Sequence, residues 1–433
     1  MPLSCKGGKG IILRKAKFSG SETYVMNLIV QGIKKHYGLD NRSTLLFFGA
    51  SFLVQAAIGA IGVLLNLYIL ALGFSEDFAG TVMSAKLLAT GIVCLPAGLL
   101  CSRWGVSRTL IAGSAALGLG ILLVSLTASP WLLLAGAVLI GSALAVKTVC
   151  VPLFLVENSS PRTRQNLFSL NFSLMMLANM AGTALSGFLP EMWTDTQAGL
   201  AGTLGFYGLL ALISVLPLVL IASNKRVIPA SRRQSILDFP LILKDKNLVR
   251  LLITHSLIGF GAGFIIPLFN IFMSKKLGAS PGQIGVIMSI GQISTALGGL
   301  LVPLVVNRLG QVTAIVVLRL ASIPFLILIA NINNLYGLGA AYFIRTTLMN
   351  MTNPAESSFT MELAGEKRVA MSSLLSSMNT ITRAISVLAS GWIMTRYSYG
   401  VPYYLTCVLY AITTVLFLVW FRPQKQATNQ PAH

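Results

Sequence analysis

Charged side chains inside long apolar stretches are the first feature of this sequence that could do chemistry. Five cations and one carboxylate lie well inside such stretches: Lys86, Lys147, Arg319, Arg345, Arg383 and Glu356. Because burying a charge in a membrane is costly, side chains of this kind usually face a cavity or a partner. Excess positive charge in a low-dielectric cavity is most stable when an anion occupies it. The pattern therefore predicts a binding site for a small organic anion.

The depth of each cation separates those expected to line a cavity from those able to reach the surface. Arg345 and Arg383 lie about 11 and 14 residues into their stretches, and Lys147 lies about nine residues from one end. The eight residues between Lys86 or Arg319 and an end span roughly 12 Å, which a long side chain bridges in part by snorkelling. We expect Lys147, Arg345 and Arg383 to face the cavity, with Lys86 as a further candidate for substrate binding.

Glu356 is the one carboxylate of this set and hence the candidate acid for proton coupling. A buried glutamate beside a cation can change its protonation when a cavity opens or closes. The alternative is a fixed ion pair of Glu356 with Lys147 or Arg383, which would leave a mostly neutral, aromatic-lined site. His255 is a second group that could take a proton, the alternative being a hydrogen-bonded histidine that only packs.

Membrane-spanning helices are the elements that must position these residues. Of the 433 residues, 55% are hydrophobic and 10% are charged, whereas soluble proteins carry about 25% charged residues, so a water-soluble domain is excluded. A helix needs roughly 20 apolar residues to cross the bilayer core. Stretches of this kind occur twelve times, at about 45–72, 78–102, 109–128, 131–156, 166–190, 203–222, 248–274, 282–306, 311–331, 334–361, 369–395 and 399–421.

The basic residues predict how these spans are oriented, because lysine and arginine are retained on the cytoplasmic side. With both termini inside, 24 of the 32 basic residues are cytoplasmic. The net charge of +20 is thereby explained, attraction to anionic lipid is secondary, and nucleic-acid binding is not needed. The predicted parts are a basic tail 1–43, a six-helix half 44–222, a central loop 223–247, a second half 248–421 and a tail 422–433.

The two predicted halves repeat each other. Nine residue pairs recur at an offset of 204 or 205, among them Asn66/Asn270, Gly80/Gly285 and Gly187/Gly391. Because six spans is an even number, both copies enter the membrane the same way, which predicts a parallel repeat with a site between the halves near the bilayer midplane. Asn66 and Asn270 lie near one end of spans one and seven, where they either bind solute or bridge helices.

A loop motif carries a resemblance to a known family. Between spans two and three stands Gly98-Leu-Leu-Cys-Ser102-Arg103-Trp-Gly105-Val-Ser-Arg108, echoed in the second half by Asn307-Arg308-Leu-Gly310. With twelve spans and the repeat, the chain from about 44 to 421 resembles the major facilitator superfamily, whose signature here is Gly-x-x-x-Asp-Arg-x-Gly-Arg. The resemblance implies a cytoplasmic gate formed by Gly98, Ser102, Arg103, Gly105, Asn307, Arg308 and Gly310. Serine and asparagine replace the family aspartate, so a charge relay in this gate is in doubt.

The resemblance implies an all-α membrane protein with twelve transmembrane helices. Spans one, four, seven and ten would line the cavity and span nine would face lipid, which makes Arg319 the expected snorkelling residue. It also implies a secondary transporter that moves a small organic solute across the plasma membrane by alternating access, with protons as a candidate coupling ion.

Two other functions stay open at this point, a proton-coupled exporter of drugs or lipophilic compounds and a non-transporting membrane sensor. The exporter motif Gly-x-x-x-Gly-Pro is not matched by Gly182–Pro190, whose glycines have the wrong spacing. No phosphate-binding loop, Gly-x-Ser-x-Gly or His-Glu-x-x-His motif is present in the sequence. We therefore expect neither an enzyme nor a cofactor or metal.

The cysteines and the first residues carry weaker signals. Five cysteines, Cys5, Cys94, Cys101, Cys150 and Cys407, form an odd set without a CxxC pair, so we expect buried small side chains and no disulfide framework. The first 43 residues lack the apolar core of a signal peptide. Tyr24–Ile33 is weakly amphipathic, and Met26 is an alternative start.

Overall fold

The computed structural model describes residues 42–160, 163–221 and 239–421, and all regular structure in these ranges is helical. The predicted tails and most of the predicted central loop lie outside them. The first half contains α2 (Arg42–Ala71), α3 (Glu76–Trp104), α4 (Val106–Ser125), α5 (Pro130–Glu157), α6 (Arg164–Phe188), η1 (Leu189–Met192), α7 (Thr196–Ile213) and α8 (Val215–Ile221). The second contains α10 (Phe239–Lys244), α11 (Lys246–Ile265), α12 (Phe269–Leu277), α13 (Pro281–Leu309), α14 (Gln311–Asn331), α15 (Leu335–Ala364), η2 (Gly365–Lys367), α16 (Arg368–Arg396) and α17 (Val401–Trp420).

The repeat predicted from residue spacing is confirmed by where the helices begin. Helices that correspond in the two halves start 204 or 205 residues apart, at residues 76 and 281, 106 and 311, 130 and 335, 164 and 368, and 196 and 401. Gly105 and Gly310 separate corresponding helices with φ values of 85° and 76°. Glycine adopts this backbone conformation without the steric penalty of a Cβ atom, which explains why it recurs at both turns.

Ten helical segments of the described chain are long and apolar enough to cross a membrane. The other two predicted spans coincide with α15 and α16, which are 30 and 29 residues long but more polar. Span six begins at Thr196 rather than 203, because the Asp195 side chain accepts hydrogen bonds from the backbone N–H groups of Gln197 and Ala198 and so caps the helix. Span seven is interrupted between Ile265 and Phe269 around Pro267, which lacks a backbone donor.

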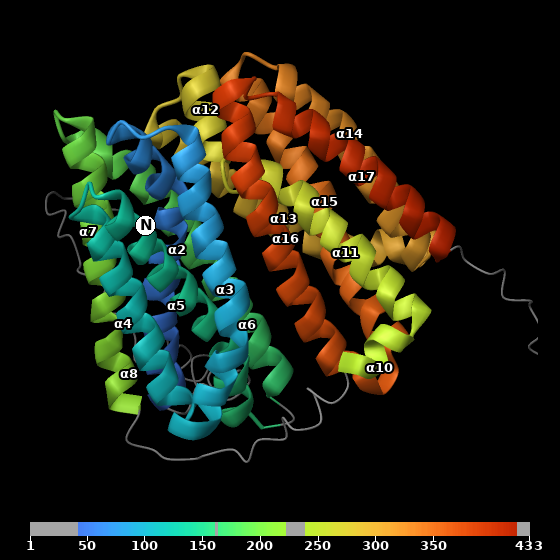
Figure 1. Ribbon diagram of the computed structural model, residues 1–433. Helices are drawn as coiled ribbons and strands as arrows, with labels where there is room; N and C mark the ends of the chain where they lie inside the picture. Colours follow the sequence, from blue (N-terminus) through green and yellow to red (C-terminus); the bar gives the residue numbers. More distant parts are fainter. Residues whose placement is uncertain (1–41, 161–162, 222–238, 422–433) are drawn as a thin grey trace, which may run out of the picture.

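Glycines bring the two halves together at one end of the bundle. A Cβ atom on Gly391 of α16 would lie 3.1 Å from the Gly80 Cα atom of α3, and one on Gly187 of α6 would lie 3.1 Å from the Gly285 Cα atom of α13. Such small residues let helix backbones approach closely in a membrane. The halves diverge toward the opposite end, where α8 and α10 lie (Figure 1). We call these the closed end and the open end.

Hydrogen bonds near the helix ends also join the halves at the closed end. The Glu191 carboxylate accepts a hydrogen bond from the Gly282 backbone N–H over 3.0 Å, and the Tyr399 hydroxyl donates to Glu76 over 2.8 Å. Partial burial and the neighbouring Glu76 carboxylate raise the pKa of Tyr399 to about 12. The tyrosine therefore remains a hydrogen-bond donor across the physiological pH range.

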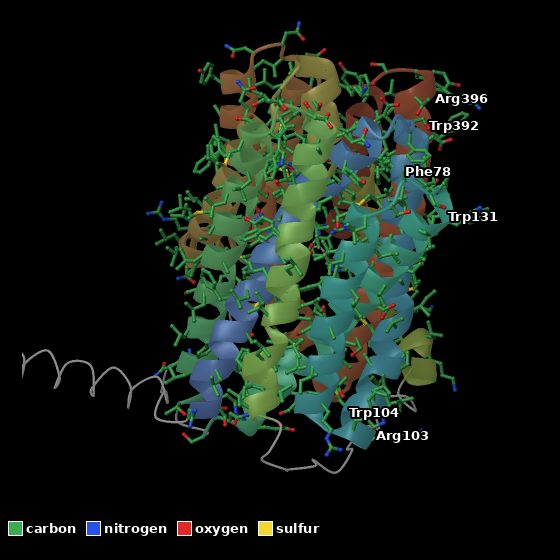
Figure 2. The ribbon with its side chains drawn as sticks, turned by 90° about the vertical axis from the view of Figure 1, so that its left-hand side faces the viewer. Phe78, Arg103, Trp104, Trp131, Trp392 and Arg396 are labelled. Carbon is green, nitrogen blue, oxygen red and sulfur yellow. A yellow bond between two sulfur atoms is a disulfide. The ribbon has the colours of Figure 1, made fainter. Side chains whose placement is uncertain are left out.

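Aromatic and basic side chains mark the two ends of the bundle. Arg103 and Trp104 lie at the open end, whereas Trp131, Trp392 and Arg396 lie toward the closed end (Figure 2). The Arg396 guanidinium carbon is 5.2 Å from the Trp392 ring centroid. Tryptophan is enriched at membrane–water interfaces, so this distribution fits a bundle that spans the bilayer from end to end.

Two cysteines correct the sequence prediction. Cys101 of α3 and Cys150 of α5 form a disulfide, with their Cα atoms 6.8 Å apart. The two helices approach closely because Gly141 of α5 packs against the backbone of Lys86 in α3, where any Cβ atom would clash. The expectation of small unpaired side chains was wrong at these two positions, because cysteine spacing in a sequence does not reveal which helices pack together.

Candidate substrate-binding site

Arg319 is an internal ion-pair partner and does not snorkel. The residue is 1% exposed on α14, and its guanidinium forms an ion pair with the Glu356 carboxylate of α15. Its guanidinium carbon also lies 5.3 Å from the Phe417 ring centroid of α17. The snorkelling prediction was wrong because α14 packs against both α15 and α17, and the face that carries Arg319 is the packed one.

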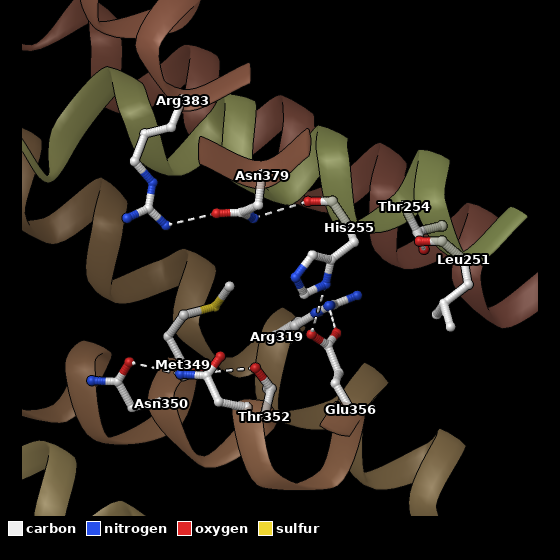
Figure 3. Close-up of polar contacts among 11 residues, drawn as sticks. Leu251, Thr254, His255, Arg319, Met349, Asn350, Thr352, Glu356, Asn379 and Arg383 are labelled. Carbon is white, nitrogen blue, oxygen red and sulfur yellow. Dashed lines mark hydrogen bonds and ion pairs between the residues drawn. The ribbon is translucent and has the colours of Figure 1, made fainter. Parts of the chain in front are cut away.

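Glu356 lies at the centre of a polar network that links four helices (Figure 3). Its second carboxylate oxygen is 3.6 Å from His255 Nδ1 of α11. The backbone carbonyl of His255 accepts a hydrogen bond from the Asn379 side chain of α16 over 3.2 Å, and Asn379 in turn accepts one from Arg383 over 3.2 Å. The ion-pair partner of Glu356 is therefore Arg319, and the alternative in which Glu356 pairs with Lys147 or Arg383 was wrong about the partner.

Arg345 and Arg383 have no carboxylate partner among the described residues. Arg345 of α15 is 5% exposed, and its one hydrogen bond in the described structure is donated to the Tyr410 hydroxyl over 3.4 Å. The Nε atoms of both arginines are buried without a partner in the described ranges. The second half therefore holds two positive charges, Arg345 buried and Arg383 half-buried, that Glu356, already paired with Arg319, does not neutralise.

The two candidate lysines belong to the first half. Lys147 of α5 donates a hydrogen bond to the buried Gln55 amide of α2, and it lines a cavity of only about 20 Å³. Lys86 of α3 is 8% exposed and lies beside Gly141 of α5. The structure thus brings Arg319, Arg345 and Arg383 into one half and holds Lys86 and Lys147 in the other.

A larger cavity of about 250 Å³ lies within the second half, beside Arg345. Helices α11 to α15 and α17 contribute its walls, and its polar and aromatic lining includes Phe269, Gln292, Tyr342, Arg345, Thr346 and Tyr403. Of these residues, only Arg345 was predicted from the sequence. Tyr342 lies three residues before Arg345 on α15 and hence on the same helix face, which is the signal that could have identified it.

Asn66 and Asn270 form a reciprocal bridge between the halves. The Asn66 amide donates to the Asn270 side-chain oxygen over 2.8 Å and to the Pro267 carbonyl over 2.7 Å. Asn270 donates in return to the Val63 carbonyl over 2.7 Å. Of the two roles left open by the sequence, the structure shows helix bridging, and solute binding by this pair stays a prediction.

The predicted gate residues lie at the open end. Arg103, Asn307 and Arg308 are exposed there, and Ser102 donates a hydrogen bond to the Leu99 carbonyl of its own helix over 2.8 Å. Neither arginine has an ion pair within the described ranges. This location is consistent with side chains that would contact each other only when the open end closes, and their gate role stays a prediction. The gate role of Gly98, Gly105 and Gly310 also stays a prediction.

Similarity to solved structures extends over most of the chain. The crystal structure of the nucleoside transporter NupG has a TM-score of 0.74 at 14% identity, covering 88% of this chain and 100% of that chain. A bacterial homologue of the human lysosomal transporter Spinster, in an inward-facing and occupied conformation, has a TM-score of 0.70 at 14% identity, covering 90% and 98%. A D-xylose–proton symporter has a TM-score of 0.67 at 13% identity, covering 87% and 96%. At these identities the likeness shows the fold alone.

Sequence comparison identifies the family. Curated protein sequences give no match. A family profile matches residues 47–259 and 251–433, and therefore both halves. The chain accordingly belongs to the Major Facilitator Superfamily.

Proposed function

We propose that this membrane protein is a secondary active transporter that moves a small organic anion across the plasma membrane by alternating access. The observation that carries this proposal is a pair of arginines, the buried Arg345 and the half-buried Arg383, which lack a carboxylate partner within the described chain. Isolated buried charges are strongly unfavourable. An anion bound beside them would compensate their charge, and Lys86 and Lys147 would add to the attraction from the other half.

The arrangement of the halves supports a rocking mechanism. They contact each other at the closed end and diverge at the open end (Figure 1). The excess of basic residues in the segments assigned to the inside places the open end toward the cytoplasm. The conformation would then be the inward-facing one, with both chain termini in the cytoplasm and the gate residues Arg103 and Arg308 apart.

Glu356 and His255 are the groups we propose for proton coupling. The Glu356 carboxylate contacts Arg319 and lies 3.6 Å from His255, and the His255 backbone is tied through Asn379 to Arg383. A proton accepted by either group would alter the contacts between α11, α14 and α15. Through this network, protonation of Glu356 or His255 would change the hydrogen bonding of Arg383.

Binding of organic anions is expected to stabilise the purified protein against heat. An anion at a hundred times its Kd should add about 2.7 kcal/mol to the free energy of unfolding. The measurement is thermal unfolding in detergent with a panel of organic anions and a panel of lipophilic cations. We expect the anion effect to vanish in Arg345→Gln and to persist in Arg250→Gln, which removes a charge from α11 outside the cavity.

The same panel of compounds distinguishes an anion transporter from a drug exporter and from a non-transporting sensor. Stabilisation by lipophilic cations alone would contradict the anion proposal and support a drug exporter whose basic residues are paired internally. A chain that binds anions but shows no flux in vesicles would instead be a sensor built on this fold.

A further inference from the structure

Three buried polar atoms without a partner belong to residues that line the 250 Å³ cavity of the second half. They are Arg345 Nε, Thr346 Oγ1 and the Tyr403 hydroxyl, from residues that are 5%, 7% and 1% exposed. None has a hydrogen-bond partner in the part of the chain that the structure describes. Buried polar groups in native proteins are nearly always hydrogen-bonded. The lining of the cavity thus includes the cation Arg345 and two residues with unpartnered hydroxyl groups, which suits a ligand with acceptor oxygens.

Aromatic rings form another wall of the same cavity. The rings of Phe269 and Tyr342 are stacked, with centroids 4.5 Å apart and planes 23° apart. Gly291 of α13 leaves room for the Tyr342 ring, which a Cβ atom at that position would meet at 2.7 Å. Stacked rings of this kind present π-electron surface and edges to a ligand, so the wall favours an aromatic group over a saturated one.

The volume of the cavity limits the ligand to a small molecule. An apolar cavity of about 150 Å³ binds one benzene molecule, and this cavity measures about 250 Å³. The additional room corresponds to a carboxylate and one or two small substituents.

We propose that the transported solute is a small aromatic carboxylate, one ring bearing one carboxylate, bound wholly within the second half. This inference rests on the proposed anion transport and specifies its substrate class. The carboxylate pairs with Arg345, and the ring packs against Phe269 and Tyr342. Because each lining residue lies between 265 and 403, the first half contributes to closure of the site rather than to recognition.

Three matched probes test this assignment on the full-length protein: benzoate, cyclohexanecarboxylate of the same charge without a π system, and benzamide of the same shape without the charge. Affinities are measured by calorimetry on the detergent-purified chain. We expect benzoate to bind about fivefold more tightly than cyclohexanecarboxylate, the size of effect typical for an aromatic contact. Benzamide should bind at least tenfold more weakly than benzoate, because it lacks the charge that Arg345 requires.

Variants separate the ring contact from the charge contact. Tyr342→Leu should abolish the preference for benzoate over cyclohexanecarboxylate while both anions still bind. Tyr336→Leu makes the same change on the same helix at an 89% exposed position and should retain the preference. Arg345→Gln should lose binding of both anions, and Arg345→Lys should recover part of it.

The outcomes distinguish this inference from the proposed function. Equal affinity for benzoate and cyclohexanecarboxylate would overturn the aromatic class and leave anion transport standing. Benzamide that binds as tightly as benzoate would overturn both. Benzoate binding that is unchanged in Arg345→Gln would overturn the placement of the carboxylate in this cavity.

Discussion

Replacing Glu356 with alanine is expected to destabilise the protein by about 3–5 kcal/mol, the cost of leaving a buried charge without its partner. Arg319, which is 1% exposed, would lose the carboxylate that neutralises its charge. Its cation–π contact with the Phe417 ring would remain. The measurement is chemical or thermal unfolding in detergent. Glu362→Ala, on the same helix at an exposed position, is the matched control and should change stability by less than about 0.5 kcal/mol.

A double substitution shows whether the loss of stability comes from the broken ion pair. Exchange of a buried pair for apolar side chains is often neutral or stabilising, so Arg319→Met combined with Glu356→Leu should recover most of the stability. We expect this double variant to fold but to lose proton dependence of transport. Full stability of Glu356→Ala alone would contradict the buried pair.

Valine at Gly391 is expected to prevent the closed end from forming. Its Cβ atom would lie 2.6 Å from the Glu76 carbonyl oxygen and 3.1 Å from the Gly80 Cα atom, and backbone atoms cannot move aside as a flexible side chain could. Overpacking of this kind costs about 1–3 kcal/mol, which shifts the population between two conformations by roughly a factor of five to a hundred. Transport should fall accordingly.

Labelling from the outside measures this shift. A cysteine introduced at Met288, whose side chain lies close to Gly62 of the other half, should react faster with a membrane-impermeant thiol reagent when Gly391→Val is present. The chain without the introduced cysteine gives the background from the native cysteines. Gly299→Val, on α13 where a side chain meets open space, should leave labelling and transport unchanged. Equal rates for both valine variants would show that the Gly80–Gly391 contact does not hold the halves together.

The fold was predictable because its signals are local in the sequence. Apolar stretches of spanning length, basic residues between them and a constant offset between corresponding residues are all visible without a structure. The ninth span was predicted as 311–331 and observed as Gln311–Asn331. The sixth differed at its start because Asp195 caps the helix earlier than the apolar pattern indicates.

The site was predictable only in part, because its contacts depend on how each helix is rotated about its axis. The depth of Arg319 was visible, but its pairing with Glu356 follows from the face that α14 turns toward α15. Likewise, Tyr342 and Tyr403 are inconspicuous in apolar stretches and become recognisable as lining residues only once the fold brings α15 and α17 to the same cavity. Conversely, Arg345 was identified from charge and depth alone.

Counterflow in proteoliposomes measures anion transport through the Arg345 site directly. Vesicles loaded with unlabelled benzoate are diluted into labelled benzoate at pH 8, where little of the acid is in its neutral, permeant form, and protein-free vesicles give the leak. Our account predicts labelled uptake above the leak by the wild type and by Arg250→Gln, and uptake at the level of the leak for Arg345→Gln. Equal uptake by wild type and Arg345→Gln, or no uptake of any anion that binds, would contradict an anion transporter whose site is centred on Arg345.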